Sequence, residues 1–335
     1  MNKILVTGGA GFIGSNLCEY LIHKGFEVVC LDNFSTGHIR NIQYLINNHS
    51  DAFSLIEGDI RDLNTCIRAT TGVDMILHEA ALGSIPRSIN EPITTNDVNI
   101  GGFLNMLVAA RDCKIKRFIF AASSSTYGDN TDLPKVEENI GKPLSPYALT
   151  KYVDELYAEV FSKTYGLEYI GLRYFNVFGR RQDANSTYAA VIPLFIKQLM
   201  QHKSPVMNGD GTHSRDFTYI DNVLHMNLLA IKTTNPDAVN QIYNTACGER
   251  TTISHLAELT KAMQSKIDSN IASVEVKYRS MRLGDIPHSQ ASIEKAKRLL
   301  GYVPLVNFTE GLEETIKWYY SDGNHSLLTD WNKSV

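Results

Sequence analysis

The stretch that decides the fold is ILVTGGAGFIG at residues 4–14, in which an apolar run leads directly into closely spaced glycines. Gly8, Gly11 and Gly14 give the spacing GxxGxxG. The first glycine allows a tight turn from strand to helix, the second lets the backbone approach a pyrophosphate, and the third packs the helix on the sheet. Such glycines can also be purely structural, so the rest of the chain has to agree before they predict a dinucleotide site.

The pattern around this turn alternates short β-rich runs with amphipathic stretches as far as about residue 180, which favours βαβ units. The strands that we expect lie at 4–7, 27–31, 53–57, 75–78, 117–122 and 169–172. Strongly apolar strands suit a sheet that is buried on both faces. The predicted fold class is therefore α/β, with a Rossmann-type, doubly wound parallel sheet.

The second part of the chain is less regular and begins with a turn-rich segment at 208–212. Shorter helical patterns follow near 222–231, 253–263 and 308–319. We expect a dinucleotide-binding domain at 1–180 and a smaller C-terminal α/β substrate lobe at 181–335, with some crossing of the chain between the two. A cleft between packed lobes is the default ligand site.

The composition is that of an ordinary globular chain of 335 residues, 43% of them hydrophobic and 20% charged. The formal net charge of -4 leaves no basic footprint for nucleic acid. The five cysteines are scattered and include no CxxC pair, so neither a disulfide framework nor a metal site is expected. The N-terminal apolar run is too short for a signal peptide or a membrane span. We therefore expect a cytoplasmic protein without nucleic-acid or membrane partners.

A carboxylate ends the second predicted strand. Asp32 comes 18 residues after Gly14, where it can accept hydrogen bonds from ribose hydroxyls and repel a 2′-phosphate. The polar loop at 33–37 follows it directly. Asp59 ends the next strand region and can bond an adenine amino group or, alternatively, cap a helix N-terminus. These positions favour NAD over NADP as the ligand.

Groups suited to proton transfer follow further along the chain. Tyr147 and Lys151 are four residues apart and therefore neighbours on one helix face. An ammonium beside a phenol favours the phenolate and moves the Tyr pKa toward that of a useful general base. Three serines at 123–125 follow the strand at 117–122, at the strand end where open α/β sheets bind ligands. A serine-rich turn or a Tyr–Lys pair alone is unremarkable, but together with the glycine turn they predict an enzyme.

Eight motifs in chain order carry a resemblance to a known family. They are TGGAGFIGS at 7–15, DNFSTG at 32–37, HEAALGS at 78–84, SSSTYG at 123–128, SPY at 145–147, LRYFNVFG at 172–179, RDF at 215–217 and RLGD at 282–285. The chain resembles the extended short-chain dehydrogenase/reductase superfamily over nearly its whole length. Within it, the chain looks most like nucleotide-sugar 4-epimerases, close to the bacterial UDP-N-acetylglucosamine/UDP-N-acetylgalactosamine 4-epimerases that supply surface-polysaccharide precursors.

The resemblance implies a catalytic set of Ser123, Tyr147 and Lys151. Tyr147 would take the proton from the sugar O4 while the C4 hydride passes to NAD, and the transient 4-keto sugar would receive the hydride on its other face. Lys151 would bind the nicotinamide ribose as well as tune Tyr147. Three consecutive serines leave the register of the hydroxyl partner open by one position.

The resemblance also assigns binding residues. The cofactor set comprises Gly8, Gly11, Phe12, Ile13, Asp32, Asn33, Ser35, Thr36, Gly37, Asp59, Ile60, Ala80, Asn99, Tyr147, Lys151 and Tyr174. The UDP-sugar set comprises Ser84, Ser124, Ser125, Asn176, Arg215, Arg282, Asp285 and Ser289. For the arginines, an ordinary surface ion pair is the alternative.

Ser289 is the position at which substrate choice is readable. Relatives restricted to sugars without an acetamido group carry a bulky Tyr at the matching position, and a packed ring does not yield to several added heavy atoms. The small Ser289 therefore predicts that UDP-N-acetylhexosamines are accepted, with UDP-glucose and UDP-galactose as further substrates.

Two other functions stay open. A nucleotide-sugar 4,6-dehydratase begins with the same oxidation but needs an acid and a base where this chain has Ser124 and Ser125. A non-catalytic NAD or nucleotide-sugar binding protein would be expected to lack Tyr147 or Lys151. A homodimer is implied by the resemblance, through helices near 103–110 and 153–161, although the same faces could pack internally.

Overall fold

A parallel sheet forms the centre of the molecule in the computed structural model, which describes residues 2–280 and 286–321. All neighbouring strands of this sheet run parallel, in the order β11-β6-β5-β4-β1-β2-β3. The strands are β1 (Lys3–Thr7), β2 (Glu27–Asp32), β3 (Phe53–Glu57), β4 (Met75–His78), β5 (Arg117–Ser123), β6 (Glu168–Tyr174) and β11 (Gln241–Thr245). The predicted fold class and the six predicted strands are confirmed.

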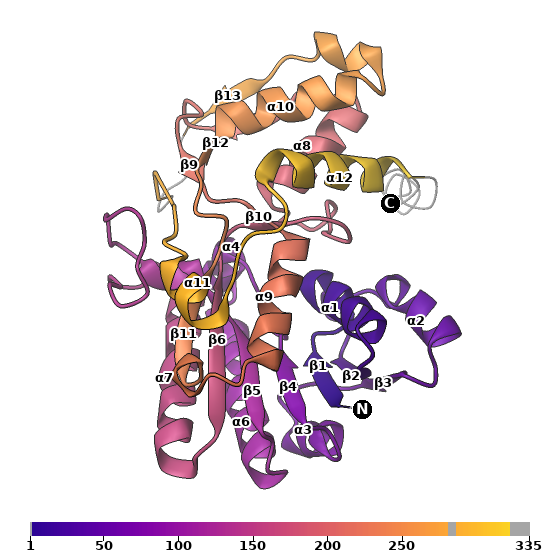
Figure 1. Cartoon of the computed structure of the whole chain (residues 1–335). Coiled ribbons are helices and arrows are strands. Elements are labelled where there is room, and N and C mark those ends of the chain that lie inside the picture. The colour runs from indigo at the N-terminus through magenta and orange to yellow at the C-terminus, as the bar shows by residue number, and fades with distance from the viewer. Residues whose placement is uncertain (1, 281–285, 322–335) are drawn as a thin grey trace.

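The apolar strands place alternate side chains on the two faces of the sheet. On β1, Ile4 and Val6 belong to one buried cluster and Leu5 to the other. Helices cover both clusters, so the central strands are buried on both faces, whereas the edge strand β3 (Phe53–Glu57) is partly exposed (Figure 1). On one side lie α1 (Phe12–His23), α2 (Gln43–Asn48) and α9 (Ile220–Lys232), and on the other lie α3 (Leu63–Thr70), α6 (Gly102–Asp112) and α7 (Pro146–Tyr165).

Most of the remaining helices and the short strand pairs gather beyond the carboxyl edge of the sheet, whereas α11 (Glu294–Leu300) packs against the edge strand β11 (Figure 1). The other remaining helices are α4 (Ile85–Asn90), α5 (Pro92–Asn96), α8 (Val191–Met200), α10 (Ile253–Ser265) and α12 (Phe308–Tyr320). The strand pairs are β7 (Val177–Phe178) with β10 (Thr218–Tyr219), β8 (Val206–Asn208) with β13 (Lys277–Arg279), and β9 (Ser214–Arg215) with β12 (Thr251–Thr252).

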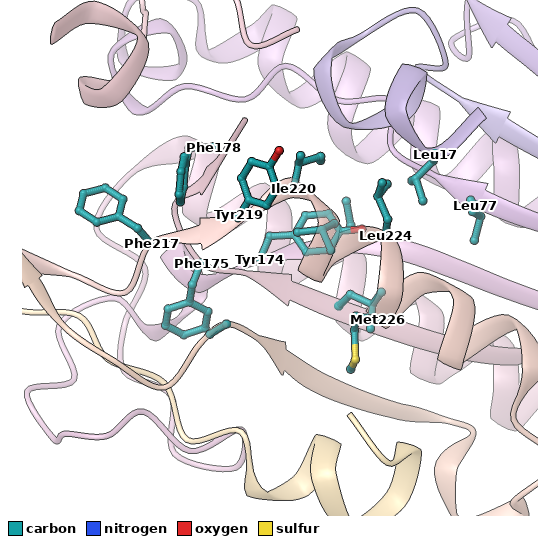
Figure 2. Close-up of a cluster of buried hydrophobic side chains, with 14 of the residues drawn as sticks. Leu17, Leu77, Tyr174, Phe175, Phe178, Phe217, Tyr219, Ile220, Leu224 and Met226 are labelled. Carbon is teal, nitrogen blue, oxygen red and sulfur yellow. The ribbon is translucent and has the colours of Figure 1, made fainter. Parts of the chain in front are cut away.

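The chain crosses between these two parts after residue 180. Helix α9 and strand β11 both come from beyond that residue, yet β11 forms the edge of the central sheet and pairs with β6. Figure 2 shows the apolar cluster that joins the parts, in which Leu17 and Leu77 lie beside Leu224. The two-lobe division at residue 180 stays a prediction.

No helix among the described residues is long and apolar enough to cross a lipid bilayer. The cytoplasmic location stays a prediction.

Candidate active site

A large cavity of about 1030 Å³ opens at the carboxyl edge of the sheet. It lies above β1 and β4, where the strand order reverses and doubly wound sheets hold their ligands. The predicted site residues that line it are Gly8, Gly11, Phe12, Ile13, Asp32, Asn33, Ser35, Thr36, Asp59, Ile60, Ala80, Ser84, Ser123, Ser124, Ser125, Tyr147, Lys151, Tyr174, Asn176, Arg215 and Ser289. Gly37 and Asn99 do not line it, and Arg282 and Asp285 lie outside the described residues.

The glycine turn packs backbone against backbone. Gly8 has φ +66°, and a Cβ atom there would lie 2.9 Å from the backbone of Ala80. A Cβ on Gly14 would lie 2.2 Å from the Gly8 carbonyl oxygen. Gly11 is the N-cap of α1, and because glycine has no side chain it cannot cap the first N–H groups of the helix. The helix therefore begins with backbone N–H groups at the cavity wall, as an anionic phosphate requires.

Asp32 is held rigidly at the end of β2. Its carboxylate accepts hydrogen bonds from the backbone N–H groups of Ala10 at 2.9 Å and Phe34 at 2.8 Å. Gly37 packs behind it, since a Cβ there would lie 2.9 Å from Asp32 Oδ1. Asp32 thus faces the cavity with a fixed orientation, and Gly37 supports that orientation from outside the lining.

Asp59 is linked to the end of β2 through Asn33, the residue that follows Asp32. Asn33 Nδ2 donates to Asp59 Oδ2 at 2.8 Å, and the Arg61 guanidinium donates to both carboxylate oxygens. The hydrogen bond from Arg61 lowers the pKa of Asp59 to about 2, so the group is ionised. Asp59 is not a helix cap, because Asp62 is the N-cap of α3.

Ser123 ends the central strand β5 at the cavity. Its Oγ atom accepts hydrogen bonds from Ser125 Oγ at 2.8 Å and from the Ser125 backbone N–H at 3.1 Å. A hydroxyl that accepts two hydrogen bonds keeps its own proton for a third partner. This geometry favours Ser123 among the three serines as the donor that faces a ligand.

Helix α7 presents Tyr147 and Lys151 to the same cavity. Ser145 caps the helix by accepting the Ala148 N–H at 3.1 Å, and Pro146 occupies the first turn, where its missing N–H costs nothing. This start fixes the helix register and brings both side chains to the cavity wall, as the four-residue spacing predicts.

Lys151 is buried and makes two hydrogen bonds within the described part of the chain. Its Nζ atom donates to the Ala121 carbonyl at 2.9 Å and to Asp154 Oδ2 at 3.2 Å. Burial, the largest single effect, would lower the pKa of the ammonium, but Asp154, Tyr147 and Glu79 together outweigh burial and raise that pKa above its usual value, with Asp154 contributing most. Lys151 is therefore a permanent positive charge in the wall of the site.

Glu79 is a site residue that the sequence reasoning missed. It follows β4 directly, lines the cavity, and accepts a hydrogen bond from the Tyr174 hydroxyl at 2.9 Å. Asn227 Nδ2 in turn donates to Tyr174 Oη at 2.9 Å. Burial raises the pKa of Glu79 to about 8, against the opposing effects of Tyr174 and Lys151. Its place at a strand end, inside the quoted HEAALGS motif, was the available signal.

Asn99 acts behind the cavity wall. Its side chain accepts the Leu82 N–H at 2.8 Å and donates to the Thr150 hydroxyl at 3.0 Å. It is fully buried and ties the loop after β4 to helix α7. Asn99 does not line the cavity, and its predicted contact with the cofactor stays a prediction.

The other end of the cavity is built from loops and short strands. Asn176 has φ +38° and donates from Nδ2 to the Asp216 carbonyl at 3.1 Å. A non-glycine residue in this region of φ is uncommon and is often found at functional sites. Arg215 donates to the carbonyls of Ser214 and Pro287, at 2.9 and 3.2 Å.

The segment that carries Ser289 is bound in place by its backbone. The Ser289 N–H donates to the Ser214 carbonyl at 3.0 Å, and the buried Asp216 carboxylate accepts the Ala291 N–H at 3.2 Å. Tyr188, which no motif indicated, also lines this end, and the Arg87 guanidinium lies 5.2 Å from its ring centre.

The chain matches a family model over residues 4–246, described as the NAD dependent epimerase/dehydratase family. The chain belongs to this family. A curated relative, the UDP-glucose 4-epimerase of Mycolicibacterium smegmatis, is 31% identical, and the match covers 95% of this chain and 98% of that protein.

Solved structures show the same likeness. A UDP-N-acetylglucosamine 4-epimerase from Methanobrevibacter ruminantium M1, in complex with UDP-N-acetylmuramic acid, superposes with a TM-score of 0.87 at 38% identity, covering 95% of this chain and 98% of that one. The UDP-glucose 4-epimerase of Thermus thermophilus, in complex with NAD, has a TM-score of 0.83 at 29% identity, covering 96% and 99%.

NAD is the cofactor of this family, and the cavity fits it. The glycine turn leaves a backbone cradle that any side chain would fill, and the carboxylate of Asp32 stands where a ribose diol needs an acceptor. The expected cofactor and the coarser functional expectation, a NAD-dependent UDP-sugar 4-epimerase, are confirmed.

Proposed function

We propose that this protein interconverts UDP-N-acetylglucosamine and UDP-N-acetylgalactosamine at C4. The observation that carries the proposal is the small side chain of Ser289 in the wall of the cavity, on a segment whose backbone is held by Ser214. A wall of this kind leaves room for a 2-acetamido group, and a rigid segment would not move aside for a larger residue. The likeness to a UDP-N-acetylglucosamine 4-epimerase at 38% identity supports the same substrate class.

The roles of the chain's own residues follow from their chemistry. Tyr147 takes the proton from the O4 hydroxyl and later returns it, and the positive charge of Lys151 lies in the wall of the same cavity. Ser123 donates a hydrogen bond to the same sugar oxygen. NAD, when bound, supplies the acceptor and then the donor of the C4 hydride. Asn176 and Arg215 bind the diphosphate.

A 4,6-dehydratase is less well supported. Elimination of water needs an acid and a base beside the serine at the end of β5. The adjoining positions are Ser124 and Ser125, and the hydroxyl of Ser125 donates to Ser123. Neither hydroxyl is suited to acid–base work at neutral pH.

The test is to purify the protein, add no NAD, and follow UDP-GlcNAc, UDP-GalNAc, UDP-Glc and UDP-Gal separately by NMR. Faster interconversion of the acetylated pair is the expected result. Interconversion of only UDP-Glc and UDP-Gal would overturn the substrate assignment, and a 4-keto-6-deoxy product would establish the dehydratase instead. No reaction with any of the four sugars would favour a binding protein.

A homodimer is part of the proposal. Leu149, Leu156 and Val160 are exposed at 51%, 43% and 53%, and their spacing of seven and four residues puts them on one face of α7. The expected contribution of α6 is smaller, because Phe103, Met106 and Leu107 are buried within the chain. Sedimentation of the wild-type protein against Leu156→Lys checks the assignment, and an unchanged mass would contradict it.

A further inference from the structure

Helix α7 buries two ion pairs that are built in different ways. Lys151 Nζ lies 3.2 Å from Asp154 Oδ2, with side-chain exposures of 3% and 0%. One residue further on, Glu155 pairs with Arg173 at 2.8 Å, with exposures of 7% and 4%. Both pairs remove charges from water, which is costly unless the remaining polar atoms are also paired.

The Glu155–Arg173 pair meets that condition. Arg173 Nε donates to Glu155 Oε1 and Nη2 donates to Oε2, both at 2.8 Å, while Nη1 donates to the Glu137 carbonyl at 2.9 Å. This bidentate geometry is typical of a structural pair. It ties α7 to β6 and to the loop that carries Glu137.

The Lys151–Asp154 pair does not meet it. Asp154 Oδ1 is buried and has no hydrogen-bond partner among the described residues. A buried carboxylate with one unsatisfied oxygen is destabilising relative to an apolar side chain of similar size. Stability therefore does not explain why position 154 is an acid. The explanation has to be the effect of this acid on Lys151.

The contacts of Lys151 show what the acid does. An ammonium has three N–H donors, and the two contacts found in the described structure use the Ala121 carbonyl and Asp154 Oδ2. Ala121 belongs to β5, the strand that ends at Ser123. The two acceptors thus fix the side chain from the strand and from its own helix, and the third N–H remains for the cavity that Lys151 lines.

We propose that Asp154 is a positioning residue, which keeps the buried Lys151 side chain protonated and directs its third N–H into the cavity beside Tyr147. The inference rests on the proposed function for the role of Tyr147. The state of Lys151 itself can be measured without any turnover.

The other charged groups near Lys151 do not replace Asp154. Burial, together with the charge of Lys151, lowers the pKa of His78 to about 3, so His78 is neutral. Burial raises the pKa of Asp154 to about 7, against the opposing charge and hydrogen bond of Lys151. Glu79 acts on Lys151 more weakly than Asp154 does, and burial raises the pKa of Glu79 further, to about 8. On α7, Tyr147 also favours the ammonium, and Glu155, which is paired with Arg173, acts on Asp154 only as a minor like charge.

The decisive variant is Asp154→Asn, which keeps the shape and one acceptor oxygen but removes the charge. Without the charge, burial lowers the pKa of Lys151 and the ammonium loses its proton in the neutral to alkaline range. The protein is labelled with lysine ¹³C at Cε, and Lys151 is assigned by its absence from the spectrum of Lys151→Met. We expect the Lys151 resonance to titrate at least about one pH unit lower in Asp154→Asn than in the wild type.

Turnover supplies the second readout. The ratio of kcat at pH 9 to kcat at pH 7 is expected to fall about tenfold in Asp154→Asn, because the neutral amine no longer favours the phenolate. The matched control is Glu155→Gln, which breaks the neighbouring buried pair. It is expected to lower the Tm while leaving both the Lys151 titration and the kcat ratio as in the wild type.

An unchanged Lys151 titration in Asp154→Asn overturns the proposal, even if kcat falls. If that variant does not fold, Asp154→Ser, which is smaller and neutral, is measured with the same expected shift. Failure of the wild-type protein to convert any UDP-sugar would instead overturn the proposed function, since the titration does not depend on it.

Discussion

The two ends of the cavity are built differently. The cofactor end consists of strand ends and one helix start, where Gly8 packs on the backbone of Ala80 and Asp32 is fixed by two backbone N–H groups. The substrate end consists of loops and strands of two or three residues, including the segment that carries Ser289. The first end allows almost no substitution at its glycines, whereas the second presents small side chains whose replacement changes the shape of the pocket.

This difference corresponds to two tasks: binding the cofactor that the family shares, and choosing the sugar that an individual member converts. A rigid backbone cradle suits a ligand that every member binds, and variable side chains suit a choice among sugars. The expected consequences differ accordingly. Changes at the cofactor end should affect folding and NAD retention, and changes at the substrate end should affect substrate preference.

The largest effect is expected where the two ends meet, at Tyr147. Replacing it by Phe removes the hydroxyl that carries the proton and should lower kcat by about 10²- to 10⁴-fold. The amount of NAD that co-purifies with the protein should be unchanged, because the glycine cradle is intact. Both quantities are measured on the same preparation, kcat by NMR and NAD after heat release.

Tyr152→Phe is the matched control, since Tyr152 lies on the same helix outside the cavity lining. It should leave kcat within a factor of about two. Loss of NAD from Tyr147→Phe would show that the two ends are not separable in this way.

The second effect concerns the cradle. In Gly14→Ala the new methyl group would lie 2.2 Å from the Gly8 carbonyl oxygen, so the turn must shift. We expect a loss of stability of about 1–3 kcal/mol and of bound NAD. Gly101→Ala is the control, because a Cβ there meets nothing within 4 Å and its φ of -61° is helical. Urea unfolding of both variants measures the difference, and equal effects would refute the backbone explanation.

The backbone features of the cofactor end can be predicted from the sequence, for the same reason that this end is rigid. Gly8, Gly11, Gly14 and Asp32 are required by backbone geometry and occur at spacings set by one βαβ unit, so local sequence carries the information. The six predicted strands are apolar runs within such units and were found. Strand β11 was not predicted, because it joins the sheet after a long excursion that no local pattern records.

The substrate end could be read only through the resemblance. Arg215 and Ser289 line the same cavity because β9 is hydrogen-bonded to the segment around Pro287, over 70 residues away in the sequence. Glu79 was missed for another reason. Its interest arises from burial beside Tyr174 and Asn227, which come from distant parts of the chain, and burial of that kind is a tertiary property.

The third effect tests the substrate end. In Ser289→Tyr a ring would occupy space beside the sugar, and the backbone bonds of the segment prevent it from moving away. We expect the ratio of kcat/KM for UDP-GlcNAc to that for UDP-Glc to fall about 10- to 100-fold. Bound NAD should be unaffected. Ser289→Ala is the control, and a fall of the same size in that variant would show that the hydroxyl, and not the free volume, determines the preference.

The smallest effect concerns stability at the boundary between the ends. The folded state raises the pKa of Glu79 to about 8, so the native protein binds more protons there than the unfolded chain between roughly pH 4.5 and pH 8. The free energy of unfolding must then decrease as pH rises through this window. Glu79→Gln cannot ionise and keeps an acceptor for the Tyr174 hydroxyl. The Tm of Glu79→Gln minus the Tm of the wild type should therefore increase by roughly 2–5 °C between pH 5 and pH 9.

Differential scanning calorimetry at pH 5, 7 and 9 measures this difference, with Glu57→Gln as the control because Glu57 is exposed at the end of β3. The Glu57→Gln difference should stay flat across the range. A flat difference for Glu79→Gln as well would mean that the carboxylate is ionised throughout. Glu79 would then place a negative charge in the cavity wall between the two ends, and that part of the wall would be solvated rather than shielded from water.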